Sequence, residues 1–148
     1  MSRLPFYLYW LSNLMYRMKI PVIPKMIMFI NRILFGAYIP PSAKIGKGVR
    51  FAYGGSGVVI HARASIGDNC IIGPCSTVGG RSRIYNVPKI GNNVYIGGGS
   101  KILGDVTIGD NVVIGANAVV LKNVADNCIV AGIPATVIKK DIDIKDYV

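Results

Sequence analysis

The chain holds a single histidine, His61, and imidazole is the side chain best suited to accept a proton near neutral pH. His61 directly follows the segment Gly57 to Ile60, and a glycine-rich loop, Tyr53 to Gly57, comes just before it. A lone histidine is more often structural than catalytic. Its place beside a loop that can adopt unusual backbone shapes makes His61 the first candidate for acid–base chemistry.

A second group of candidates interrupts the chain between residues 79 and 88, where Arg81, Arg83 and Tyr85 lie close together. The two arginines are suited to bind an acidic sugar or a diphosphate, although solvated loop charges would give the same pattern. Tyr85 and Tyr53 are suited to position a substrate or to hold an oxyanion. We therefore predict these four residues as substrate-binding residues.

The three cysteines, Cys70, Cys75 and Cys128, are odd in number and lack the spacing of metal ligands. We interpret them as reduced, structural thiols of a cytosolic protein. We predict no metal site.

The candidates belong to a segment in which an aliphatic residue returns every six positions. Apolar residues recur about every 3.6 positions in a helix and every 2 in a strand, so a period of six fits neither. It fits an all-β solenoid in which each hexapeptide forms one short strand and one turn. Ile84 keeps the period, but its flanks lack turn residues, so we expect an outward loop there. The eleven periodic positions are Ile60, Ile66, Ile72, Val78, Ile84, Ile90, Ile96, Ile102, Ile108, Ile114 and Val120.

Two helices are expected before the solenoid, over residues 3–19 and 25–34, because prolines and Gly36 bound their apolar patterns. Neither resembles a cleavable signal, and neither reaches the roughly 20 apolar residues that span a bilayer. The predicted domains are residues 1–36, a helical cap or an interfacial segment; residues 37–136, the solenoid; and residues 137–148, a tail.

Charge is concentrated in the first half of the chain. Residues 1–67 carry nine Lys or Arg and no acidic residue, and the whole chain has a net charge of +10. Such a surface attracts anionic lipid head groups or a phosphate-bearing substrate. Nucleic acid is excluded as a partner because no binding motif is present. We expect a cytoplasmic protein, with residues 1–36 either capping the solenoid or contacting the inner face of the cytoplasmic membrane.

Three segments, Ile90 to Gly104, Val106 to Leu121 and Ala131 to Ala135, together resemble the hexapeptide-repeat acyltransferase superfamily. The chain looks like its serine acetyltransferases and its bacterial polysaccharide O-acetyltransferases, and the resemblance covers residues 41–140. It implies a left-handed parallel β-helix with three hexapeptides per coil, hence about five coils here. It also implies a homotrimer with acetyl-CoA as co-substrate in a groove between neighbouring prisms.

Eighteen residues per coil would stack residues 18 apart on one edge of the prism. That edge would hold His61, Gly79, Gly97 and Gly115, and beside them Ala62, Gly80, Gly98 and Ala116. We expect the pantetheine arm of acetyl-CoA to lie against Gly79, Gly80, Gly98 and Ala116, unless the glycines serve only the turns. Lys139 would meet the nucleotide phosphates.

The chain departs from serine acetyltransferases at two places that the resemblance makes important. Those enzymes carry an Asp-His pair before the Gly-Val-Val-Ile segment, where this chain has Ala52 and Tyr53. They carry a second histidine beside Pro-Lys-Ile, where this chain has Val87.

We therefore predict an acetyl-CoA-dependent O-acetyltransferase that modifies a sugar hydroxyl in surface polysaccharide (capsule, O-antigen or exopolysaccharide) biosynthesis. His61 would be its general base and a sugar or lipid-linked saccharide its acceptor. Serine O-acetylation for cysteine biosynthesis is the alternative among enzymes, and a non-catalytic scaffold is the alternative from another class. Metal-dependent hydration is excluded because it needs several histidine ligands.

Overall fold

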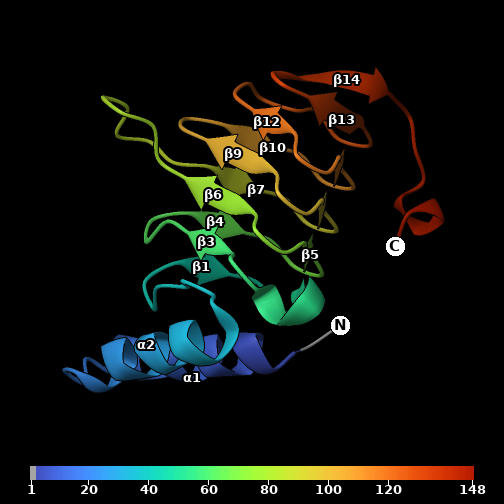
Figure 1. Ribbon diagram of the computed structural model, residues 1–148. Helices are drawn as coiled ribbons and strands as arrows, with labels where there is room; N and C mark the ends of the chain where they lie inside the picture. The colour runs from blue at the N-terminus through green and yellow to red at the C-terminus, as the bar shows by residue number, and fades with distance from the viewer. Residues whose placement is uncertain (1–2) are drawn as a thin grey trace.

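The computed structural model describes residues 3–148, in which two helices precede a parallel β-solenoid (Figure 1). Helix α1 (Leu4–Arg17) has Pro5 in its first turn, and α2 (Ile23–Phe35) has Pro24 there. Proline suits a first turn because the N–H that it lacks would have no partner in the helix. Helix α2 ends at Gly36, whose left-handed backbone (φ 65°) closes it.

Three sheets form the faces of the solenoid. The first contains β1 (Lys44–Ile45), β4 (Ser65–Ile66), β7 (Lys89–Ile90) and β10 (Thr107–Ile108). The second contains β2 (Arg50–Phe51), β5 (Ile71–Ile72), β8 (Tyr95–Ile96), β11 (Val113–Ile114), β13 (Ile129–Gly132) and the antiparallel β14 (Ala135–Lys139). The third contains β3 (Val59–Ile60), β6 (Thr77–Gly79), β9 (Lys101–Leu103) and β12 (Val119–Val120).

The chain passes from the first sheet to the second, then to the third, and back to the first. We call the turns between the second and third sheets the 2/3 edge, and those between the third and first sheets the 3/1 edge. Two short 3₁₀ helices complete the chain: η1 (Ala52–Gly55) at the 2/3 edge and η2 (Ile144–Asp146) near the C-terminus.

The core is the column of aliphatic side chains that the six-residue period predicts. Ile60, Ile72, Ile96 and Ile102 are fully buried, and the small residues two positions before each anchor are buried beside them. Repeated burial of this kind stabilises each coil only against its neighbours. The predicted solenoid with N-terminal helices is confirmed, with about four turns instead of the predicted five.

The difference in the number of turns comes from residues that leave the coils, chiefly between β6 and β7. Val78 and Ile90 occupy successive core positions although twelve residues separate them, and Ile84 is exposed in an outward loop, as predicted. Val78 therefore pairs with Ile102 one coil further on, 24 residues away. The predicted alignment of His61 with Gly97 and Gly115 is wrong, because it assumed 18 residues for this coil as well.

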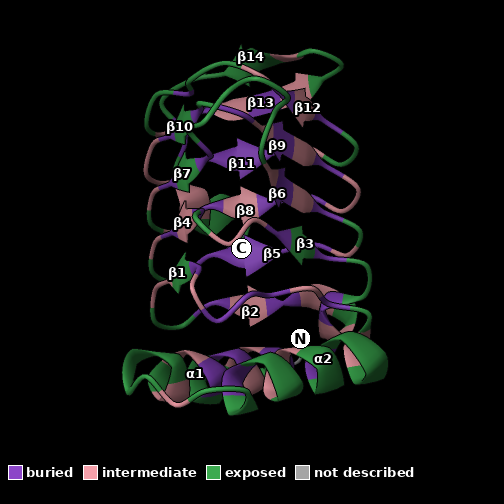
Figure 2. Ribbon diagram, turned by 90° about the vertical axis from the view of Figure 1, so that its left-hand side faces the viewer, coloured by how far each residue is buried: buried purple, intermediate pink, exposed green. Residues whose placement is uncertain are grey.

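The helix pair lies across the N-terminal opening of the solenoid, and β14 lies at the other end (Figures 1 and 2). Tyr9 joins the two parts: its buried hydroxyl donates to the Ala43 carbonyl oxygen at 2.6 Å and accepts from the Ile45 N–H at 3.2 Å. Within residues 3–148, no helix has the length and apolar character needed to cross a membrane.

Candidate active site

The strongest candidate site is the corner that His61 forms at the 3/1 edge. His61 follows β3, and Gly80 follows β6 in the next coil. A Cβ placed on Gly80 would lie 3.6 Å from Cδ2 and 3.7 Å from Nε2 of His61, and 3.9 Å from Cγ1 of Val87. The half-buried imidazole and Val87 thus both lie next to Gly80, and Val87 stands where the resemblance places the second histidine of serine acetyltransferases.

A backbone hydrogen bond orients the imidazole. The Arg63 N–H donates to Nδ1 of His61 at 3.1 Å. A neutral imidazole whose Nδ1 accepts a hydrogen bond carries its proton on Nε2. In this orientation Nε2 can donate to a ligand above Gly80 but cannot accept a proton there, so a general-base role requires the imidazole to give up its bond with Arg63.

The loop between β6 and β7 projects outward (Figure 1) and contacts this corner through Tyr85. The Arg63 guanidinium lies 3.8 Å from the centre of the Tyr85 ring, and the Asn86 side-chain amide donates to Oδ2 of Asp105 at 3.0 Å. Arg81 lies against Gly104 in the next coil, and Arg83 is exposed with a left-handed backbone (φ 65°). The loop is thus held to two coils by side-chain contacts.

A small basic hollow of about 210 Å³ lies beneath Tyr85. Lys44, Arg63 and Lys89 line it, and the register of the first sheet stacks Lys44, Ser65 and Lys89 in successive coils. Three cations within a single hollow suit a carboxylate or a phosphate group. None of the three was predicted as a site residue, because their proximity depends on how the loop is placed and on the register across it.

Three other predicted residues, Tyr53, Gly98 and Ala116, lie on the 2/3 edge of the same chain. Tyr53 is in η1, is 85% exposed and has a left-handed backbone (φ 50°). Gly98 and Ala116 lie in the turns after β8 and β11, where Gly98 touches Pro74. The predicted single edge containing His61, Gly98 and Ala116 is wrong, and one chain brings only Gly79, Gly80 and the 81–87 loop to His61.

Lys139 lies at the end of β14, away from both edges. Its ammonium group donates to the Tyr147 hydroxyl at 3.1 Å, and this hydrogen bond raises the pKa of Lys139. Lys139 is exposed, so it stays available to an anion.

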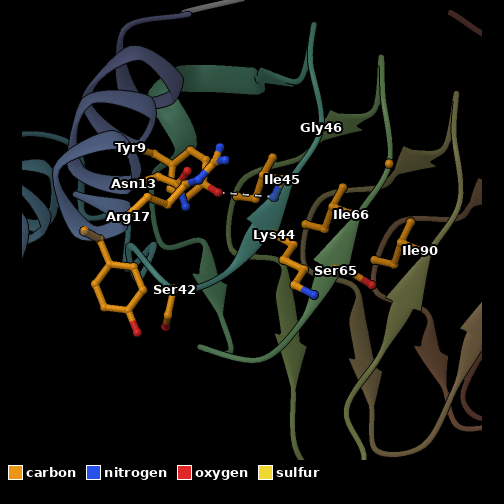
Figure 3. A pocket seen from close by; sticks show the side chains of 12 residues that line it. Tyr9, Asn13, Arg17, Ser42, Lys44, Ile45, Gly46, Ser65, Ile66 and Ile90 are labelled. Carbon is orange, nitrogen blue, oxygen red and sulfur yellow. Dashed lines mark hydrogen bonds between the residues drawn. The ribbon is translucent and has the colours of Figure 1, made fainter. Parts of the chain in front are cut away.

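The cleft in Figure 3 is larger, about 650 Å³, and lies between α1 and the first sheet. Tyr9, Asn13 and Arg17 enter it from α1, and Lys44, Ser65 and the isoleucines of the sheet form its floor (Figure 3). Tyr9 and Asn13 are already hydrogen-bonded to the backbone of residues 41–45. Since no predicted site residue lines this cleft, the His61 corner remains the better candidate.

Residues 88–122 match the family described as "Bacterial transferase hexapeptide (six repeats)". This match and the parallel solenoid confirm the predicted resemblance to the hexapeptide-repeat acyltransferase superfamily, including its serine acetyltransferase-like members.

The chain is similar to serine acetyltransferases. The Synechococcus elongatus serine acetyltransferase is 42% identical over 129 residues, which cover 86% of this chain and 52% of the relative. The Staphylococcus aureus (strain N315) serine acetyltransferase is 42% identical over 133 residues, with 88% and 62% covered. The crystal structure of the Brucella abortus serine acetyltransferase superposes with a TM-score of 0.89 at 31% identity, over 93% of this chain and 57% of that one. The chain thus spans between half and two thirds of the length of these relatives.

These relatives overturn the prediction of a polysaccharide hydroxyl as the acceptor. They are serine acetyltransferases, which is the alternative that the sequence left open. The prediction failed because it gave the departures at Ala52, Tyr53 and Val87 more weight than the similarity of the whole repeat.

Proposed function

We propose that the chain is an acetyl-CoA-dependent O-acetyltransferase whose acceptor is the hydroxyl of serine. The observation that carries the proposal is the 42% identity to serine acetyltransferases over most of the chain. One neighbour, the Brucella abortus enzyme, was solved "in complex with Coenzyme A" and has a TM-score of 0.88 at 30% identity. The three cysteines are free, which suits a reaction in the reducing cytoplasm.

In the proposed reaction, the serine oxygen forms a bond to the thioester carbonyl carbon, and the carbon–sulfur bond then breaks. The proton of the serine hydroxyl ends on the sulfur of CoA, so the products are O-acetylserine and a free thiol. The basic hollow lined by Lys44, Arg63 and Lys89 suits the serine carboxylate or a CoA phosphate.

We propose that the site is completed between two chains of a homotrimer. His61 and Gly80 occupy the 3/1 edge, whereas Tyr53, Gly98 and Ala116 occupy the 2/3 edge. A neighbour that sets its 2/3 edge against this 3/1 edge would bring all five residues to one groove. The small residues at Gly98 and Ala116 would leave room there for a pantetheine arm. The molar mass in solution tests the trimer.

The geometry favours one role for His61 in this reaction. With Nδ1 accepting from Arg63, the Nε2–H of His61 is a donor for the oxygen that becomes negative in the tetrahedral intermediate. The general-base role predicted from the sequence needs the opposite tautomer. Replacing His61 by glutamine distinguishes the donor role from the base role, because the glutamine amide can donate from the position of Nε2 but cannot take up a proton.

The experiment mixes the purified chain with acetyl-CoA and measures free thiol against a panel of acceptors: serine, homoserine and free sugars. We expect release with serine and none above background with sugars. His61→Ala and His61→Asn should each lose about two orders of magnitude in kcat, while His61→Gln keeps most of it. If His61→Gln is as inactive as His61→Ala, the base role replaces the donor role.

Two results would overturn the proposal. Full activity in His61→Ala would remove this residue from the mechanism. No thiol release with any acceptor, together with no thermal stabilisation by acetyl-CoA, would favour the non-catalytic scaffold. The replacement of the family's Asp and His residues by Ala52, Tyr53 and Val87 would then agree with a loss of catalysis.

A further inference from the structure

The outer side of α1 carries a stripe of large apolar side chains that the solenoid does not cover. Its residues follow one another at spacings of four and three, which sets them on one side of a helix. Phe6 and Tyr9, on the opposite side, pack against the solenoid core. The stripe consists of Tyr7 (54% exposed), Leu11 (38%), Leu14 (40%) and Met18 (63%).

Helix α2 repeats the arrangement. Phe35 packs against the core and touches Gly54, and the apolar stripe lies on the other side of the helix. The exposed stripe consists of Ile23 (43%), Met26 (56%), Ile30 (45%) and Ile33 (68%), with Phe29 (58%) and Leu34 (64%) at its margins. Figure 2 shows the helix pair beneath the first coil, with much of its outer surface exposed.

Polar contacts, by contrast, lie inside the helix pair. The Ser12 hydroxyl donates to the Pro24 carbonyl oxygen at 2.7 Å, and the Asn31 amide donates to the Pro5 carbonyl oxygen at 3.1 Å. Both side chains are buried. The pair thus turns its polar groups inward and its apolar stripes outward, the reverse of a helix that faces only water. Exposed apolar surface on this scale is typical of an interaction site.

Each helix also carries a line of basic residues outside its apolar stripe. Arg3, Trp10 and Arg17 are spaced by seven residues, so they form one line beside the α1 stripe, and Lys25 and Arg32 form a similar line on α2. All five are exposed, and the first acidic residue of the chain is Asp68. A second copy docked on this face would bring like charges together without a compensating carboxylate. An anionic surface would neutralise them.

We propose that α1 and α2 form a docking surface for an anionic lipid bilayer. The helices lie in the plane of the interface, with the two stripes among the upper acyl chains and the four basic side chains, Arg3, Arg17, Lys25 and Arg32, at the phosphates. Trp10 and Tyr7 suit this boundary because each has an apolar body and a polar end. The solenoid then stands on the membrane, with β14 farthest from it.

Flotation with lipid vesicles tests the proposal on the full chain. We expect the protein to float with vesicles of phosphatidylcholine and phosphatidylglycerol and to stay unbound with phosphatidylcholine alone. The double variant Lys25→Gln/Arg32→Gln should partition about thirtyfold more weakly. Ile33→Glu should weaken binding at least about tenfold, because it removes a buried apolar contact and adds an anion.

The matched control is Ile138→Glu, which changes an isoleucine of similar exposure (64%) on β14 at the other end of the solenoid. It should bind vesicles like the parent chain. Equal binding by Ile33→Glu and Ile138→Glu would overturn the proposal, as would equal binding to neutral and anionic vesicles. The face would instead be assigned to a second copy by two results together: the parent chain does not bind vesicles, and its assembly in lipid-free solution dissociates in Ile33→Glu. Circular dichroism confirms that each variant is folded.

Discussion

The contacts between successive turns at the 2/3 edge make a sharp prediction about glycine. A Cβ on Gly97 would lie 2.6 Å from the Ala116 nitrogen and the Ile114 oxygen and 2.7 Å from the Gly115 carbon. These are backbone atoms of the next coil, and the Gly97 N–H donates to the same Ile114 oxygen at 2.8 Å. Backbone atoms cannot move away by changing rotamer, as the end of a side chain can. The two coils must therefore separate locally to accommodate the methyl group.

We expect Gly97→Ala to lower the free energy of unfolding by about 3 kcal/mol, the upper end of the usual cost of overpacking. For a domain of this size, that corresponds to a fall in Tm of roughly 6–12 °C. Urea unfolding at one protein concentration measures the change, since assembly would make stability concentration-dependent.

The matched control is Gly80→Ala at the 3/1 edge. A methyl group there would meet His61 at 3.6 Å, an ordinary contact distance, so the expected change in stability is under about 0.5 kcal/mol. A loss of less than about 1 kcal/mol in Gly97→Ala, or equal losses in both variants, would refute the idea that the 2/3 edge is closed by backbone contact.

Three further predictions concern the cysteines and a ladder of hydrogen-bonded asparagines, Asn93, Asn111 and Asn127, in successive coils. Burial raises the pKa of the Cys70 thiol to about 11; the unfolded thiol ionises first as the pH rises, so the free energy of unfolding should fall by roughly 2–3 kcal/mol between pH 9 and 11. Cys70→Ala should flatten this slope and Cys75→Ala should keep it; a slope unchanged in Cys70→Ala would contradict the assignment. A maleimide should label Cys75 rapidly in the folded chain and spare the buried Cys70 and Cys128, as read by peptide mass spectrometry; early label at Cys70 would show that the coil opens. Asn111 accepts from the Asn93 amide at 3.1 Å and donates to Asn127 at 3.0 Å, so Asn111→Ala should cost about 1–2 kcal/mol in urea unfolding. Asn117→Ala, with the same left-handed backbone but outside this ladder, should cost less.

The fold was predictable because the same local solution is repeated in every coil. An aliphatic anchor, a small residue before it and a turn after it recur every six positions, so an error at one position leaves the pattern intact. The number of residues in each coil was not predictable in the same way. Ile84 keeps the period by residue type, yet its backbone pairs only with Arg81 in an isolated bridge. The cue was the missing turn residues around it, which indicated the loop but not its effect on later coils.

Only those parts of the site that depend on the regular repeat could be predicted from the sequence. His61 and Gly80 lie together because they flank one coil of regular length. Arg63 meets Tyr85 of the loop between β6 and β7, and no local pattern encodes that contact. The stripes of the two helices were visible as apolar spacing, but the buried polar contacts of Ser12 and Asn31, which turn those stripes outward, were not.

We propose that acetyl transfer takes place at the His61 corner of the 3/1 edge. A crystal structure of the chain with CoA bound tests it most directly. We expect the CoA sulfur within about 4 Å of the His61 imidazole, with the pantetheine arm running along Gly98 and Ala116 of a neighbouring chain. CoA bound with its sulfur away from His61, for example in the cleft between α1 and the first sheet, would contradict the account.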